Sequence, residues 1–559
     1  MKRSFNRAIS ANSRFVSHQW LSATNPDPTF QQLTVLQTAL KNILAGAELK
    51  RPPADELIWG RMKSPTVADF QQVFLWYDYF SIPQSAARAE ERRAAIDSIC
   101  SFVSRCFFFV ILCPTLRHEE GYLVSRATWA QRGWTRMERM AQELGREDVC
   151  VISVQMASHP TLDTSIGGVG DPGRAPGMGH FTVDDDRKPL GSVMHQLIGS
   201  KLASFLVKGD FHNYRFLMCL QGRCLGGLGT GPLEALAPGF STEIDPFSEP
   251  DAFVVARFLH ETGFKHVRER DAAGWTPICY AVLKDDPFLV EALVNSRADV
   301  NDSISKGKYE AKLPRHLPIL QIACAYHCNR AMCALLSARA NVNAQAGIGG
   351  TALTVAAAYN NMDAVQLLAK ADVDPDIDVF PGTSAFKVAC GHSGPETIRE
   401  MMRLFPVNLR FSLHCGLAFF AEGHTVRYLI EARADINEQL SIPMRKGTWW
   451  AVLKALSLRH RFSPSPLTYL AYHHRGATPL MFSIMTGNFE AACILVAAGA
   501  RSDLRNYRGR TAQDMVEELG APISLDRGYL EALGLAATSL PRCSQEESAE
   551  VDYLISESV

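Results

Sequence analysis

The phrase Thr276-Pro277-Ile278-Cys279 returns later in the chain as Thr478-Pro479-Leu480-Met481. Small and apolar residues follow both phrases at the same spacings: Ala281, Val290, Leu293, Val294 and Ala298 after the first, and Ser483, Ala492, Leu495, Val496 and Ala500 after the second. A threonine caps the start of a helix, and a proline suits the first turn because its missing N–H costs nothing there. The later apolar residues fall on one face of a second helix, which is buried only when a neighbouring unit packs on it.

The same spacing can be followed between these copies from Pro318, Thr351, Ser384 and Ser412, with a partial unit at 509–512. This pattern resembles the ankyrin repeat, a unit of about 33 residues made of a turn and two antiparallel helices. The resemblance implies an all-α ankyrin-repeat solenoid over residues 251–530, whereas an ordinary helical bundle would lack the recurring start. One continuous core is then expected to contain Leu293, Leu335, Leu368, Met401, Leu429 and Leu495.

Composition sets outer bounds on the class of protein. The chain has 559 residues, 47% of them apolar, and a formal net charge of −1, which predicts several domains and gives no argument for nucleic-acid or membrane binding. The apolar run from Cys106 to Cys113 is far shorter than the roughly 20 residues that span a bilayer. None of the 14 cysteines forms a Cys-x-x-Cys pair, so we expect no metal site, small core residues at Cys324 and its neighbours, and a reducing cytoplasmic location.

Residues 1–156 alternate between apolar segments and helical ones. Expected strands at 14–17, 73–77, 107–112 and 149–154 alternate with expected helices at 27–44, 86–104 and 128–144. This order predicts a flavodoxin-like α/β domain, with a parallel sheet between two layers of helices. Ligands bind such sheets at the carboxyl ends of the strands, where Ser17, His18, Trp20 and Asp78 are expected.

Two short motifs in this domain resemble known families. Residues 15–18 and Trp134-Thr135-Arg136-Met137-Glu138 resemble the first strand and the Trp-Cys-x-x-Glu segment of Toll/interleukin-1 receptor (TIR) domains, with Thr135 in place of Cys. Residues 75–84 resemble the strand and loop of fungal heterokaryon-incompatibility (HET) domains. In TIR domains that hydrolyse NAD the glutamate is catalytic, so the resemblance implies Glu138 as catalytic residue, with NAD as substrate. It implies a binding site made of Ser17, His18, Trp20, Asp78, Trp134 and Arg136.

A carboxylate suits this chemistry, because cleavage of the nicotinamide–ribose bond passes through an oxocarbenium-like state that a negative charge stabilises. Two other interpretations stay open. Glu138 lies between arginines, as on a solvated helix face, and Trp129 and Trp134 fit a core. Many TIR domains are adaptors that bind proteins or one another without catalysis, and this resemblance implies self-association equally well.

Three segments lie outside the α/β domain and the repeats. Residues 157–250 form a Gly- and Pro-rich linker that contains an apolar helical pair, and residues 531–559 form an acidic tail expected to be disordered. An insertion at about 438–476 contains Trp449 and Trp450. The insertion is either a projecting partner-binding site built on these indoles or a degenerate repeat that buries its aromatic residues.

These features together predict a cytoplasmic recognition and signalling protein. The concave face of the solenoid is expected to bind a protein partner and to present the TIR-like domain. The alternative is a TIR-type NAD hydrolase that the ankyrin repeats regulate.

Overall fold

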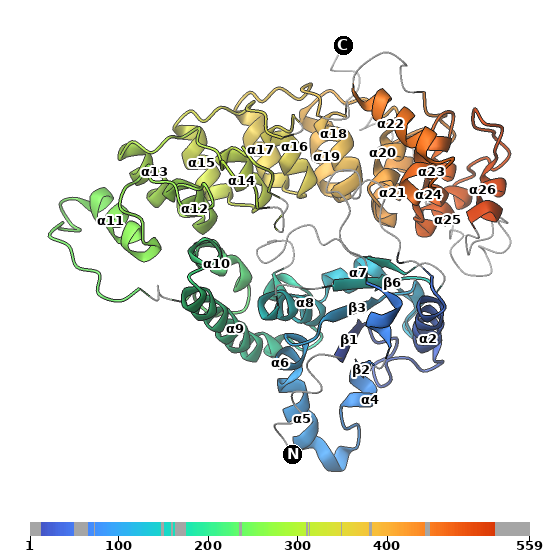
Figure 1. Cartoon of the computed structure of the whole chain (residues 1–559), viewed down its shortest axis with the longest axis horizontal. Helices are drawn as coiled ribbons and strands as arrows, with labels where there is room; N and C mark the ends of the chain where they lie inside the picture. The colour runs from blue at the N-terminus through green and yellow to red at the C-terminus, as the bar shows by residue number, and fades with distance from the viewer. Residues whose placement is uncertain are drawn as a thin grey trace, which may run out of the picture.

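The computed structural model describes residues 13–47, 49, 65–71, 73–146, 150–157, 160–162, 175–233, 237–308, 311, 313–347, 349–379, 383–441 and 448–519. An N-terminal part is built on a five-stranded sheet, and the remainder is largely helical (Figure 1). Among these residues no helix has both the length and the apolar character needed to cross a bilayer.

The central sheet has the strand order β2–β1–β3–β6–β7. Its strands are β1 (Ser13–His18), β2 (Phe74–Tyr77), β3 (Phe108–Leu112), β6 (Cys150–Val154) and β7 (Thr161–Leu162). The first four are parallel, as predicted, but β7 pairs antiparallel with β6, so the sheet is mixed. The expectation of an all-parallel sheet was wrong at this edge, because a two-residue strand is too short to leave a periodic signal.

Helices cover both faces of this sheet. One face holds α2 (Gln31–Leu44) and η1 (Val67–Phe70), and the other holds α6 (Ile99–Val103) and α8 (Gly133–Gly145). The smaller elements are α4 (Asp78–Ser81), η2 (Ala86–Arg88), α5 (Ala89–Asp97), β4 (Leu116–Arg117), β5 (Leu123–Val124), α7 (Arg126–Gln131), η4 (Pro176–Met178) and η5 (Asp184–Asp186). The helices expected at 86–104 and 128–144 are therefore both interrupted.

The helical pair expected within 157–250 consists of α9 (Arg187–Lys208) and α10 (Phe211–Cys224). Leu217 and Met218 of α10 belong to the core beneath α8 and α9, whereas Phe216 and Leu220 belong to the core of the helical part. The same helix thus has one face in each core. A buried network fixes it to the next segment, because Arg215 donates to Asp271 (3.0 Å), which also accepts from the hydroxyl of Tyr280 (2.5 Å).

The remainder of the chain is a succession of antiparallel helix pairs (Figure 1). After α11 (Pro250–Thr262), the pairs are α12 (Pro277–Ala281, extended by η6, Val282–Lys284) with α13 (Pro287–Asn295), α14 (Ile319–Ala325) with α15 (Asn329–Ser337), α16 (Ala352–Ala358) with α17 (Met362–Lys370), α18 (Ala385–His392) with α19 (Pro395–Leu404), α20 (Ser412–Ala418) with α21 (Gly423–Glu431), and α24 (Pro479–Thr486) with α25 (Phe489–Ala497). The first helix of each pair contacts the first helix of the next pair, and the second helix contacts the next second helix. The series ends with α26 (Ala512–Leu519), which packs against α24.

Backbone geometry repeats with the units. Left-handed residues close the turn between the two helices of a pair at Asp285, His327, Asn360 and Gly487, and follow the second helix at Arg297, Arg339, Asp372 and Gly499. Successive units are also tied by side-chain amides. Asn301 Oδ1 accepts from the backbone N–H of Asn341 (2.8 Å), and Asn437 Oδ1 accepts from that of Arg501 (2.8 Å).

The predicted core of second-helix residues is confirmed, since all six lie in one cluster and none is more than 1% exposed. The predicted threonine caps are confirmed at Thr351 and Thr478, whose side chains accept a backbone N–H three residues later. Thr276 differs. Its hydroxyl donates to Asp302 (2.5 Å), and its side chain accepts no backbone N–H.

The insertion forms a hairpin of α22 (Thr448–Arg459) and α23 (Pro466–His473). It does not interrupt the stack, since α24 packs directly on α20 and α25 on α21, while α23 lies against α24. Its aromatic residues pack on the turn before α26, where the guanidinium of Arg508 lies 3.5 Å from the ring centre of Tyr472. The insertion is therefore an added hairpin rather than a degenerate repeat within the stack.

Candidate functional site

A chain of hydrogen bonds joins Glu138 to the end of the first strand. The indole N–H of Trp129 donates to Ser17 Oγ (2.9 Å), and Ser17 Oγ lies 2.5 Å from Glu138 Oε2. Because an indole nitrogen can only donate, the serine oxygen accepts from Trp129 and directs its own hydrogen toward the carboxylate. Ser17 is supplied by β1, Trp129 by α7 and Glu138 by α8, so three elements position this group.

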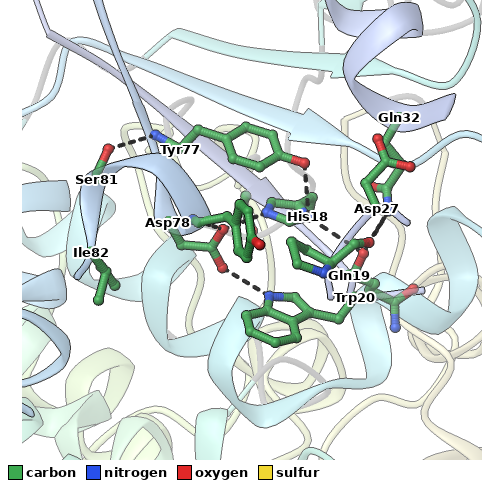
Figure 2. A network of polar contacts seen from close by, with 12 residues as sticks. His18, Gln19, Trp20, Asp27, Gln32, Tyr77, Asp78, Ser81 and Ile82 are labelled. Carbon is green, nitrogen blue, oxygen red and sulfur yellow. Dashed lines mark hydrogen bonds and ion pairs between the residues drawn. The ribbon is translucent and has the colours of Figure 1, made fainter. Parts of the chain in front are cut away.

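A second group lies at the carboxyl ends of β1 and β2, where Figure 2 shows His18, Trp20 and Asp78 turned toward one another. His18 Nε2 is 2.7 Å from Asp78 Oδ1, and the indole N–H of Trp20 donates to Oδ2 (3.0 Å). Burial alone would raise the pKa of Asp78. Attraction to His18 and the hydrogen bonds from His18, Trp20 and the backbone N–H of Tyr79 outweigh burial, and the pKa of this carboxyl lies below its ordinary value.

Glu138 has the opposite electrostatic behaviour. Burial raises its pKa from 4.5 to about 8, the Ser17 hydrogen bond opposes that rise, and the negative charge of Asp78 adds to it. The two carboxyl groups therefore differ in protonation near neutral pH, with Asp78 ionised and Glu138 largely protonated. Environments that drive two acids apart in this way are typical of paired acid and base groups in catalytic sites.

This pKa makes stability depend on pH in a defined direction. A carboxyl group whose pKa is higher in the folded than in the unfolded chain holds its proton more tightly when folded, so its contribution to stability decreases as the pH rises. As the pH rises from about 5 to 8, we expect the free energy of unfolding of the unchanged chain to decrease, relative to that of Glu138→Gln, by on the order of a few kcal/mol. Chemical denaturation of both proteins across this range measures the difference. Parallel pH profiles would contradict it.

The structure brings together only part of the predicted site. Five of the residues form two hydrogen-bonded groups near the carboxyl ends of β1 and β2: Ser17 with Glu138, and His18 and Trp20 with Asp78. Two other residues turn away from these groups. The indole N–H of Trp134 donates to Asp186 (2.8 Å), and Arg136 donates to the carbonyl groups of Ala130 (2.7 Å) and Ala175 (3.3 Å).

Trp129 and Arg132, which the motif does not include, act on the group of Ser17 and Glu138 instead. Trp129 donates to Ser17, and the positive charge of Arg132 offsets a small part of the rise in the pKa of Glu138. The helix break at Arg132 explains the difference, because it gives the residues of α7 and α8 separate directions that a single helix over 128–144 would not have. A glycine after a run of polar residues was the available signal for this break.

The residues before α9 hold the start of α8 in place. Gly133 donates its N–H to the carbonyl of His180 (2.9 Å), and the ring of Phe181 lies where a Cβ of residue 133 would be, 2.0 Å from its nearest carbon. Only glycine allows this approach without moving Phe181. The helix that carries Glu138 is thus fixed by the segment that leads into α9 and α10.

A second candidate surface lies on the stack of helix pairs. Aromatic rings recur where the first helix ends in four successive pairs, at Tyr326, Tyr359, His392 and Phe419. Tyr326 is buried against Phe216 of α10, with ring centres 5.8 Å apart, whereas the other three are half-buried. The side chains of Trp449 and Trp450, the predicted partner-binding residues, lie outside the described residues.

Part of the helical region matches a known family. The family model of the ankyrin repeat matches residues 273–304, which contain the Thr276-Pro277 phrase, α12 and α13. No curated protein matches the chain. The match supports an ankyrin-repeat protein.

Proposed function

We propose that the helix pairs from α11 to α26 form one ankyrin solenoid that binds a protein partner and presents the α/β domain for signalling or self-association. The repeating left-handed turns and the side-chain amide bonds between units support a solenoid, because both recur at equivalent positions outside residues 273–304. Ankyrin repeats generally mediate protein binding, and a stack of them offers an extended surface.

The single observation that carries this proposal is the row of half-buried aromatic rings at Tyr359, His392 and Phe419. Aromatic residues dominate the energy of protein interfaces when they lie near the centre of the contact. The N-terminal end of the same row is closed, because α10 covers Tyr326. The partner is therefore proposed to bind the middle units of the stack.

We expect Tyr359→Ala combined with Phe419→Ala to weaken partner binding by about tenfold or more, since interface aromatics typically contribute over 1 kcal/mol each. A photo-crosslinking residue at position 419 of the full chain would first identify the partner, and titration of the purified pair would then give Kd. Arg330→Ala with Lys370→Ala, two exposed residues on second helices, is the matched control. Equal loss of binding in both variants would contradict the proposed surface.

The second candidate function is TIR-type hydrolysis of NAD at the edge of the sheet. It is supported by the hydrogen bond between Ser17 and Glu138 and by the opposite pKa shifts of Glu138 and Asp78. In this proposal Glu138 acts in its ionised form, which is the minor form at neutral pH, and stabilises the oxocarbenium-like state or orients the attacking water. Trp20, which is half-buried, contacts the nicotinamide or adenine ring. Release of nicotinamide from NAD by the purified full chain is the direct test.

A further inference from the structure

The hairpin of α22 and α23 lies in a long stretch of the repeat region without an acidic residue. Between Glu438 and Glu490 the chain contains no Asp or Glu, and its six Lys and Arg residues are Arg445, Lys446, Lys454, Arg459, Arg461 and Arg475. The protein as a whole is close to neutral, so this positive charge is local. A helix with such a composition favours negatively charged partners.

One side of α22 is both apolar and basic. Its exposed side chains recur three or four residues apart and continue into the turn that follows: Ala451, Lys454, Ala455, Leu458, Arg459 and Phe462. Leu458 is 53% exposed and Phe462 is 88% exposed. Among the described residues no carboxylate pairs with Arg459 or Arg461. We call the side chains of Leu458, Arg459, Arg461 and Phe462 the basic apolar tip.

The other side of α22 is already used for packing. Leu453 is buried against the hairpin, and Ser457 Oγ accepts from Arg508 (3.3 Å), which lies in the turn before α26. The hydroxyl of Tyr469 in α23 donates to Glu518 in α26 (2.7 Å). The described chain therefore ends at Leu519 directly beside the hairpin that carries the basic apolar tip.

The residues after Leu519 include a segment with complementary chemistry. Residues 544–559 contain no Lys or Arg, and they carry Glu546, Glu547, Glu550, Asp552 and Glu557. Their apolar residues, Val551, Tyr553, Leu554 and Ile555, lie among these acids. Such a segment can place carboxylates on Arg459 and Arg461 while its apolar side chains cover Leu458 and Phe462.

We propose that residues 546–557 bind the basic apolar tip of α22 within the same chain. The linking stretch, 520–545, has 26 residues, which is enough chain for residues 546–557 to reach the adjacent hairpin from Leu519. A tether of this kind gives an effective concentration in the millimolar range, so a weak contact is occupied within one molecule before a second copy or a free acidic peptide competes. The acidic segment then shields the tip from other anionic partners.

The test uses the full chain and a labelled peptide of residues 544–559. In the tail variant, Glu546, Glu547, Glu550 and Glu557 are changed to Gln and Asp552 to Asn, which removes the negative charge at nearly constant shape. We expect fluorescence anisotropy at low salt to show peptide binding to the tail variant and little or none to the unchanged chain, whose tip is occupied. Adding Arg459→Gln and Arg461→Gln to the tail variant should weaken peptide binding roughly tenfold, as expected for the loss of two charged contacts.

Arg330→Gln with Lys370→Gln removes the same charge from exposed positions elsewhere in the stack and should leave peptide binding unchanged. Equal binding of the peptide to the unchanged chain and the tail variant would overturn the proposal, and so would failure of the tail variant to bind. Binding of the tail variant to phosphatidylserine vesicles through Arg459 and Arg461, without peptide binding, would assign the tip to a membrane surface instead. If the unchanged chain excludes the labelled peptide only at high protein concentration, the basic apolar tip binds the acidic segment of a second copy.

Discussion

Replacement of Leu335 by alanine is expected to lower the free energy of unfolding by about 2 to 5 kcal/mol. Leu335 has no exposed surface and lies on α15 in the core shared by all the helix pairs. Its truncation removes apolar burial and leaves a cavity that the rigid neighbouring units fill only in part. Denaturant unfolding of the full chain, followed by circular dichroism, measures the loss.

Leu336 provides the matched control, because it is the next residue on the same helix and is only partly buried. Leu336→Ala makes the same chemical change with less area and no enclosed cavity, so its cost should be clearly smaller. Similar losses for Leu335→Ala and Leu336→Ala would show that α15 does not bury one face between neighbouring units, contrary to the solenoid proposal.

Glu138→Gln is expected to reduce nicotinamide release by about 10²- to 10⁴-fold if the α/β domain hydrolyses NAD, since this is the usual contribution of a general acid or base. The amide keeps the size of the side chain and can still accept the hydrogen bond from Ser17, but it cannot carry charge or exchange the proton. Nicotinamide release by the full chain, measured with both proteins at the same pH, gives the ratio.

Glu120→Gln is the control for this experiment, because Glu120 is an exposed glutamate of the same domain. Its variant should retain the activity of the unchanged chain. If Glu138→Gln retains full activity while folded, Glu138 is not the catalytic residue. If neither protein releases nicotinamide, the second candidate function fails, and the recognition function, which depends on the stack, is not affected.

Sequence spacing predicted the repeated helix pairs well because each unit buries the same positions against its neighbours. Leu293 and Leu495 are far apart in the chain, yet both must be apolar for the same reason, so the pattern survives in the sequence. The strand β3 could be located for a similar reason, since it is buried along its whole length and is uniformly apolar.

The directions of individual polar side chains could not be predicted in this way. Trp134 and Arg136 belong to the motif that suggested the site, but their partners, Asp186 and Ala175, come from a segment about 40 to 50 residues later. Nothing in the motif itself specifies that contact. Gly133 marks the break between α7 and α8 locally, but the close approach of Phe181 to this glycine is a tertiary contact that the local sequence does not specify.

The position of α10 in two cores bears on how the protein can be divided. A fragment that ends at residue 156 lacks α9 and α10, so it exposes the apolar surface of α8 that Met194 and Leu217 cover in the full chain. A fragment that begins at residue 251 lacks Arg215 and leaves Asp271 buried without its cation. Neither fragment keeps all of its buried contacts. We therefore expect the cooperative folding unit to extend across the boundary that composition alone would draw.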